Sequence, residues 1–96
     1  MQYNFEWDPA KARGNHTKHG VSFEEAATIF QDPHMLTIFD LEHSTAVEDR
    51  WVTLGISLAG RLLLVCHSFR EEGLEPAIRM FSARKAAAHE RRAYKG

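Results

Sequence analysis

The spacing of apolar residues in the first twenty positions predicts a short strand followed by a helix. Aromatic and polar residues alternate in YNFEW, residues 3–7, as they do in a half-buried strand. Asp8 and Pro9 follow as a helix N-cap and a first helical residue, and Gly20 is suited to end the helix. The predicted helix covers residues 9–19 and is weak, because its apolar face is mostly alanine.

A second helix is predicted to begin after Ser22. Ser22 and Glu25, in the run SFEE, form a capping box. Apolar residues then recur at helical spacing at Phe23, Ala26, Ala27 and Phe30. Asp32-Pro33 is expected to end this helix, because the residue before a proline disfavours helical backbone angles.

Four further strands are predicted in the second half of the chain. They cover residues 35–41, 50–58, 61–69 and 76–82. Ala59-Gly60 turns the chain between two of them, which therefore form a hairpin. The strand at 61–69 is apolar on both faces, so we expect it at the centre of the sheet.

Ser82 is expected to cap a last helix over residues 83–94. The resulting order is one strand, two helices, four strands and one helix. Hairpin-connected strands with helices before and after them predict an α+β fold, in which the helices pack on an antiparallel sheet. The length predicts a single domain over residues 1–96.

Charge is distributed unevenly along this scaffold. The net charge is −1, yet residues 1–76 carry −6 and residues 77–96 carry +5. A chain that is acidic overall is not expected to coat nucleic acid, whereas a local basic face is compatible with phosphate binding at one site. No membrane span or signal peptide is recognisable, and the single Cys66 cannot form an internal disulfide, so we expect a cytoplasmic protein.

Arg79 and Arg84 are the first candidates for a phosphate site. Arg79 is expected in the middle of a strand, which holds a guanidinium rigidly. Arg84 is expected in the first turn of the last helix, where the helix dipole disfavours a cation unless an anion offsets it. An internal carboxylate or a phosphate ligand would do so, and we favour a phosphate for the pair. Arg91, Arg92 and Lys95 are expected on a solvated face.

Lys18 and His19 close the first predicted helix. Cations are favourable at a helix C-terminus, which is a sufficient structural reason for both residues. In the functional interpretation, His19 transfers protons near neutral pH and Lys18 stabilises negative charge beside it. His16 and His19 also have the spacing of a metal pair, but no cysteine or evident third ligand accompanies them, so no metal site is predicted.

Glu48 and Arg50 end a polar loop and are either a general base beside a cation or a simple ion pair. His67, in the middle of a strand, is either a partly buried histidine with a local hydrogen bond or a substrate-binding residue, together with Ser82 and Lys85. Lysine, histidine, glutamate and arginine without cysteine or paired aspartates suit metal-independent phosphodiester chemistry, which needs charge stabilisation and proton transfer.

Three stretches of the chain resemble the BrnT toxins of bacterial type II toxin–antitoxin systems. They are FEWDPAKARGNHTKHGVSFEEAATIF, EDRWVTLGISLAGRLLLVCHS and IRMFSARKAAAHERRAY. The combination of W-D-x-x-K, N-x-x-K-H-G-V-x-F-x-E-A and I-R-x-x-S-A-R-x-A carries the resemblance. The matching residues are Asn15, Lys18, His19, Glu48, Arg50, His67, Arg79, Ser82 and Arg84. The family pattern usually has isoleucine where Phe81 stands.

The resemblance implies a RelE-like fold and a small bacterial ribonuclease that needs no cofactor and inhibits translation. It also implies neutralisation by a BrnA antitoxin with a ribbon-helix-helix part, and operator DNA bound only through the complex. The expected catalytic residues are Lys18, His19, Glu48, Arg50, Arg79 and Arg84, and the expected substrate-binding residues are His67, Ser82 and Lys85. The alternative is a non-catalytic module whose basic C-terminal region docks an acidic partner.

Overall fold

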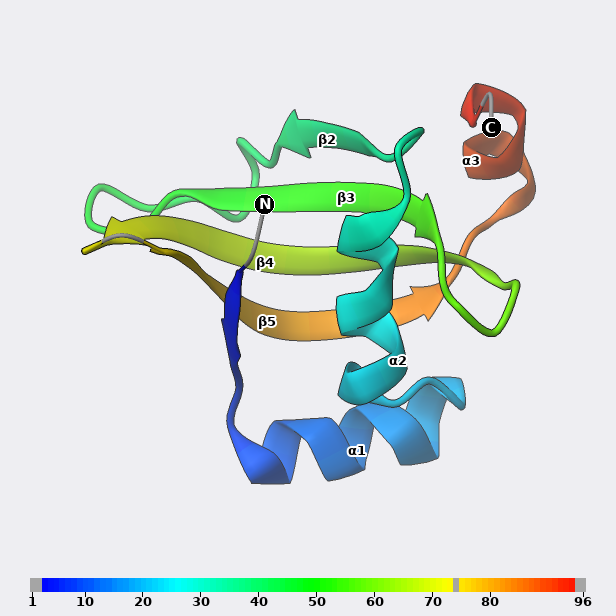
Figure 1. Cartoon of the computed structure of the whole chain (residues 1–96), viewed down its shortest axis with the longest axis horizontal. Helices are drawn as coiled ribbons and strands as arrows, with labels where there is room; N and C mark the ends of the chain where they lie inside the picture. Colours follow the sequence, from blue (N-terminus) through cyan, green and yellow to red (C-terminus); the bar gives the residue numbers. More distant parts are fainter. Residues whose placement is uncertain (1–2, 74, 95–96) are drawn as a thin grey trace.

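One five-stranded sheet forms the middle of the molecule (Figure 1). The computed structural model describes residues 3–73 and 75–94, without the side chain of residue 72. The elements in this part are β1 (Asn4–Glu6), α1 (Pro9–His19), α2 (Phe23–Ala27), the 3-10 helix η1 (Thr28–Gln31), β2 (Leu36–Phe39), β3 (Arg50–Ile56), β4 (Leu62–Glu72), β5 (Glu75–Lys85) and α3 (Ala88–Ala93). None of the helices described is long and apolar enough to cross a membrane.

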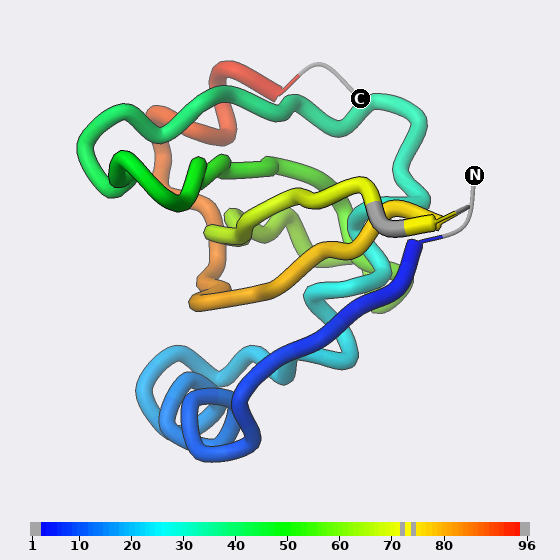
Figure 2. The backbone as a smooth tube through the Cα atoms, turned by 90° about the vertical axis from the view of Figure 1, so that its left-hand side faces the viewer, coloured from blue at the N-terminus to red at the C-terminus, as the bar shows by residue number. Residues whose placement is uncertain are grey.

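The strands are arranged in the order β1-β5-β4-β3-β2, so β4 lies at the centre, as its apolar sequence predicts. The α+β class is confirmed, but the sheet is mixed rather than antiparallel, because β1 pairs with β5 in parallel. This direction lets the chain continue from β1 straight into α1, which runs along the remaining edge of β5 (Figures 1 and 2). The other pairs of neighbouring strands are antiparallel.

Helix α1 has the boundaries that its end signals predict. The carboxylate of Asp8 accepts a hydrogen bond from the backbone N–H of Ala10 at 3.2 Å, and Gly20 ends the helix with a φ of 68°, which glycine adopts without steric cost.

Asn15 attaches α1 to the sheet. It is the buried residue of this helix, and its side-chain amide makes the hydrogen bonds to the backbone of Ala83 that a neighbouring strand would make. Its Oδ1 accepts the N–H of Ala83 at 3.0 Å, and its Nδ2 donates to the carbonyls of Ala83 at 2.8 Å and Val21 at 3.0 Å. The exposed edge of β5 is thereby satisfied at this point.

The predicted second helix forms as α2 and continues as η1 over one face of the sheet. Ser22 accepts the backbone N–H of Glu25 at 3.0 Å, but the Glu25 carboxylate binds Arg61 and Ser57 instead of returning to the cap. The largest fully buried apolar side chains, beneath and within these helices, are Phe23, Ile29, Leu63, Ile78 and Met80.

The C-terminal prediction is wrong at its start. Strand β5 does not end at Ser82 but pairs with β4 as far as Lys85, and α3 begins six residues later than Ser82, behind Ala87. Hydrogen bonding to the apolar start of β4, at Leu63–Val65, outweighs the helix propensity of the alanines here. Arg84 therefore lies in a strand and not in the first turn of a helix, and Lys95 lies outside the described residues.

Strand β5 contains one extra residue relative to β4. His67 is opposite Met80 and Cys66 is opposite Ser82, so Phe81 is the additional residue of a β-bulge. Bulges re-aim side chains and are common beside active sites. Here the bulge lies where α1 passes the edge of β5, which makes this junction a natural place to look for a site.

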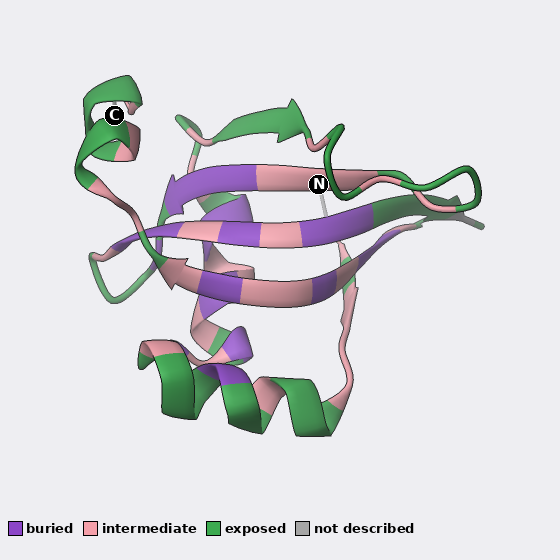
Figure 3. Cartoon of the chain, turned by 180° about the vertical axis from the view of Figure 1, so that it is seen from behind, coloured by how far each residue is buried: buried purple, intermediate pink, exposed green. Residues whose placement is uncertain are grey.

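Among the described helices, α3 is the one that lies on the face of the sheet away from α2, at one end of it (Figure 3). We call this face of the sheet the open face. The strand registers place five uncharged residues on it, which are Val52, Leu54, Leu64, Cys66 and Ser68. Arg50 lies on the same face in β3, and Arg79 and Arg84 lie on it in β5.

Candidate functional site

A pocket of about 270 Å³ lies where α1 meets the bulge of β5. It is lined by Lys11, Gly14, Asn15, Lys18, His19, Phe81 and Ser82. Three predicted site residues, Lys18, His19 and Ser82, are thus brought together, although Ser82 is more than sixty positions from the other two in sequence. Lys18 is exposed and His19 is half-buried, so both can meet a ligand from solvent.

Phe81 connects this pocket with the open face. The guanidinium carbon of Arg50 lies 3.9 Å from the centroid of its ring, and Nζ of Lys11 lies 5.6 Å from it. Both are within the distance at which a cation is attracted to an aromatic face. The group formed by Lys11, Lys18, His19, Arg50, Phe81 and Ser82 is called the Phe81 site below.

Arg50, the first residue of β3, is held by two residues of the loop that precedes the strand. Its Nε donates to Oε1 of Glu48 at 3.3 Å, and its backbone N–H donates to Oγ of Ser44 at 2.8 Å. The structural alternative of an Arg50–Glu48 ion pair is therefore formed. Both side chains remain about one-third exposed, so the pair is open to a ligand.

Arg79 lies in the same cross-strand row as Arg50. The register pairs Arg50 with Ser68 and Ser68 with Arg79, so the two arginines flank one buried serine at a backbone separation of roughly 10 Å. The side chain of Arg79 is on the opposite face from Ile78 and Met80, which are buried. Arg79 therefore adds a second arginine on the open face beside the Phe81 site, which already contains Arg50.

Arg84 already has a counter-charge. Its two terminal nitrogens each donate to one oxygen of Glu90 at 2.8 Å, and Glu90 also accepts the N–H of Ala87. The fork-shaped pairing with Arg84 lowers the pKa of Glu90 to about 2 and raises that of Arg84. This is the internal carboxylate that the sequence left as the alternative to a phosphate.

Two further predicted residues are not gathered with the others. His67 is 2% exposed and on the helix-covered face, where Nδ1 donates to the carbonyl of Ser68 at 3.1 Å and Nε2 accepts from Thr53 at 2.7 Å. Burial lowers its pKa, so the ring is neutral. Lys85 is the last residue of β5, near Glu25, whose pKa is lowered mainly by its hydrogen bond with Arg61 and to a smaller extent by the charge of Lys85.

Sequence reasoning missed two members of the Phe81 site, Lys11 and Phe81. Lys11 could have been found from helical spacing, because Lys11, Asn15 and Lys18 recur at i, i+4 and i+7 on one face of α1. Phe81 carried one signal, an aromatic ring where the family pattern usually has isoleucine. Its stacking with Arg50 depends on the bulge, which nothing in the local sequence reveals.

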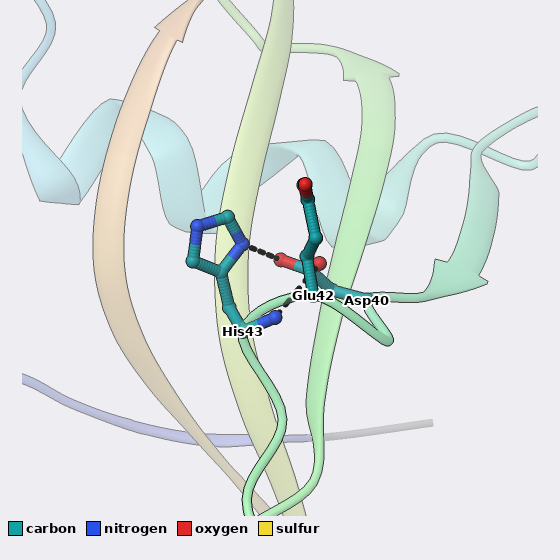
Figure 4. A group of neighbouring side chains, drawn as sticks. All are labelled: Asp40, Glu42 and His43. Carbon is teal, nitrogen blue, oxygen red and sulfur yellow. Dashed lines mark hydrogen bonds and ion pairs between the residues drawn. The ribbon is translucent and has the colours of Figure 1, made fainter.

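One group of described side chains has metal-ligand geometry. The ligand atoms of Asp40, Glu42 and His43 lie within 4.8 Å of one another in the loop after β2 (Figure 4). Asp40 and His43 already form an ion pair at 2.8 Å, and Glu42 and His43 are exposed. These contacts account for the cluster without a cation, and we assign no metal to it.

Comparisons with known proteins agree with this architecture. The family model described as "Ribonuclease toxin, BrnT, of type II toxin-antitoxin system" matches residues 7–90. The 1.1 Å crystal structure of the Brucella abortus ribonuclease toxin BrnT is similar, with a TM-score of 0.61 and 23% identity, over 90% of this chain and 99% of that one. No curated protein matches significantly. Because the family model spans most of the sequence, the chain belongs to the BrnT family of ribonuclease toxins of type II toxin–antitoxin systems.

Proposed function

We propose that the protein cleaves RNA at the Phe81 site and that the reaction needs no metal ion. The observation that carries this proposal is the meeting of Arg50 from β3 with Lys11, Lys18 and His19 from α1 around Phe81 of β5. Such a group offers cations for a phosphodiester, an aromatic face for a base and an imidazole for proton transfer.

The proposed reaction begins with the ribose 2′-hydroxyl. A base removes its proton, the 2′-oxygen attacks the adjacent phosphorus, and a 2′,3′-cyclic phosphate forms while the 5′-oxygen leaves with a proton. Arg50 and Arg79 hold the phosphate and neutralise the charge that grows on it, and Lys18 assists from the pocket. Ser82 lines the same pocket as Lys18 and is proposed to bind the substrate.

His19 and Glu48 are both proposed as candidates for the base. His19 lines the pocket next to Lys18, whereas Glu48 rests on Arg50 at the open-face side. The two are distinguished by single variants, because the base variant loses the rising limb of the pH–rate profile and the other does not.

Arg84, His67 and Lys85 are not part of the proposed site. Arg84 is engaged by Glu90, His67 is buried on the other face, and Lys85 lies at the far end of β5. We propose that Arg84 acts on stability, by holding α3 to the sheet, and that His67 orders the interior.

The test is cleavage of protein-free RNA in the presence of a chelator. Wild-type protein is expected to produce fragments that end in 2′,3′-cyclic phosphate, and Arg50→Ala is expected to lose them while it stays folded. Activity that depends on added Mg²⁺ would contradict the metal-independent mechanism. Absence of cleavage, together with tight binding of an acidic protein, would favour the docking-module alternative.

Translation inhibition and neutralisation by a BrnA-type antitoxin are also proposed. The open face is suited to an antitoxin because the edge strand β2 exposes Leu36 and Ile38 on it, and Ile38 is paired with Val52, two residues along β3 from Arg50. An acidic, partly apolar segment would satisfy both features and cover the same cations that bind RNA. Operator DNA would then be bound by the antitoxin's ribbon-helix-helix part, and Ile38→Asp is expected to weaken the complex.

A further inference from the structure

His43 and Asp40 form a pair with the geometry of an oriented acid–base group. Oδ2 of Asp40 is 2.8 Å from Nδ1 of His43, and Oδ1 accepts the backbone N–H of the same histidine at 3.3 Å. A carboxylate acceptor at Nδ1 places a proton on that nitrogen and fixes the ring. The opposite nitrogen, Nε2, is thereby presented to solvent, since the side chain is 65% exposed.

The pair is fixed to Arg50 through the backbone. The N–H of Asp40 donates to the carbonyl of Arg50 at 2.8 Å. The hydroxyl of Ser44, the residue after His43, accepts the N–H of Arg50 at 2.8 Å and donates to the carbonyl of Asp40 at 2.7 Å. His43 therefore lies between Asp40 and Ser44 in the loop, and both of these residues hydrogen-bond to the backbone of Arg50, whose guanidinium lies over Phe81.

The loop places the imidazole over the open face. Figures 2 and 3 show residues 40–49 folding to the side of the sheet away from α2. In Figure 4 the ring of His43 lies in front of β4, with its second nitrogen directed away from Asp40, on the β5 side. The charged and titratable groups that contacts and strand registers place in this loop and at this end of the open face are Asp40, Glu42, Glu48, Arg50, Cys66 and Arg79, whereas Arg84 and Glu90 pair with each other near α3.

We infer that His43, oriented by Asp40, is the general acid that protonates the 5′-oxygen leaving group. This inference rests on the proposed cleavage at the Phe81 site. His43 supplies the proton that the 5′-oxygen takes as it leaves, which the proposed base does not provide. The imidazolium gives the proton on Nε2 to the departing oxygen as the P–O5′ bond breaks, and it retains the proton on Nδ1 against Asp40. Water returns the proton on Nε2 after release of the products. Asp40 is a positioning residue in this scheme.

A change of leaving group tests this role directly. The two substrates are protein-free RNA and the four ribonucleoside 3′-(4-nitrophenyl phosphates), whose leaving group departs as a stable anion and needs no proton. His43→Gln is expected to cleave RNA about 10²–10⁴-fold more slowly than wild type and the nitrophenyl esters at near wild-type rate. The falling limb of the pH profile on RNA should disappear in this variant.

Control variants separate the acid from other roles. Asp40→Asn should show a smaller, parallel loss on RNA with no loss on the esters, and Arg79→Ala should lose both substrates because it removes a phosphate contact. His34→Gln, an exposed histidine outside the loop, should match wild type. Thermal unfolding of each variant checks that it is folded.

The outcomes are distinguishable. If wild-type protein cleaves neither substrate, the proposed function falls and this inference falls with it. If wild type is active but His43→Gln keeps its rate on RNA, or loses both substrates equally, only the assignment of His43 is overturned.

Discussion

The guanidinium of Arg50 stacks on the ring of Phe81 at 3.9 Å, although their strands are separated by β4. Arg50 spans that strand above the buried Ser68, and the bulge turns Phe81 toward it. This one contact joins the pocket beside α1 to the cations of the open face. Because of this contact, the pocket and the open face form one continuous surface for a nucleotide and its phosphate.

Removal of the ring should therefore weaken substrate binding. We expect Phe81→Leu to raise KM for RNA about two- to fivefold with little change in kcat, because a partly exposed cation–π contact contributes roughly 0.5–1 kcal/mol. Steady-state kinetics measure this effect. Phe69→Leu, at an exposed aromatic residue outside the site, is the matched control. An unchanged KM in Phe81→Leu would show that the stack does not position Arg50.

Arg79 and Arg84 should differ sharply. Arg79→Ala is expected to reduce kcat/KM for RNA about 10²–10³-fold, as does loss of one donor to a developing anion. Arg84→Ala should cost far less, since Glu90 already occupies its guanidinium. Arg92→Ala, at an exposed position of α3, serves as the control for loss of charge. Equal losses at residues 79 and 84 would mean that Glu90 releases Arg84 during the reaction.

Asn15 is predicted to matter for stability. Asn15→Ala leaves the N–H and carbonyl of Ala83 and the carbonyl of Val21 without their partner. Buried backbone groups that lose a partner cost about 1–3 kcal/mol each, so we expect the loss of three partners to lower the free energy of unfolding by at least about 3 kcal/mol. Urea denaturation checks this value, with Thr17→Ala, at an exposed position of α1, as the control. A loss below 1 kcal/mol would indicate that water replaces the amide.

The contact between Glu90 and Arg84 should make stability depend on pH. The pKa of Glu90 is lowered from 4.5 to about 2, so the folded state binds this proton less readily than the unfolded state. The stabilisation is present above pH 4.5 and is lost as the pH falls toward 2. Glu90→Gln should unfold more easily than wild type at pH 6, by about 1–2 kcal/mol after solvent screening of a partly exposed pair, and the difference should vanish near pH 2. Thermal unfolding at several pH values measures it, and a constant difference would contradict the assignment.

Local chemistry was sufficient for the elements whose boundaries are set by neighbouring residues. Asp8 and Gly20 define α1, and Ser22 begins α2, because a capping side chain or a left-handed glycine acts within a few residues. The apolar character of residues 61–69 likewise indicated the central strand, since a run that is apolar on both faces favours a position between other strands. The family patterns identified the BrnT family before the fold was known.

The end of β5 and the composition of the site needed the tertiary structure. The alanines after Ser82 favour a helix locally, but backbone bonds to β4 across the sheet hold the strand as far as Lys85. The same pairing places Arg84 where it binds Glu90, and it places His67 in the interior instead of on the open face. The sequence by itself determined which residue types were available for phosphate chemistry. Strand register, one bulge and the path of the loop after β2 decided which of them meet, because these depend on contacts between segments far apart in the chain.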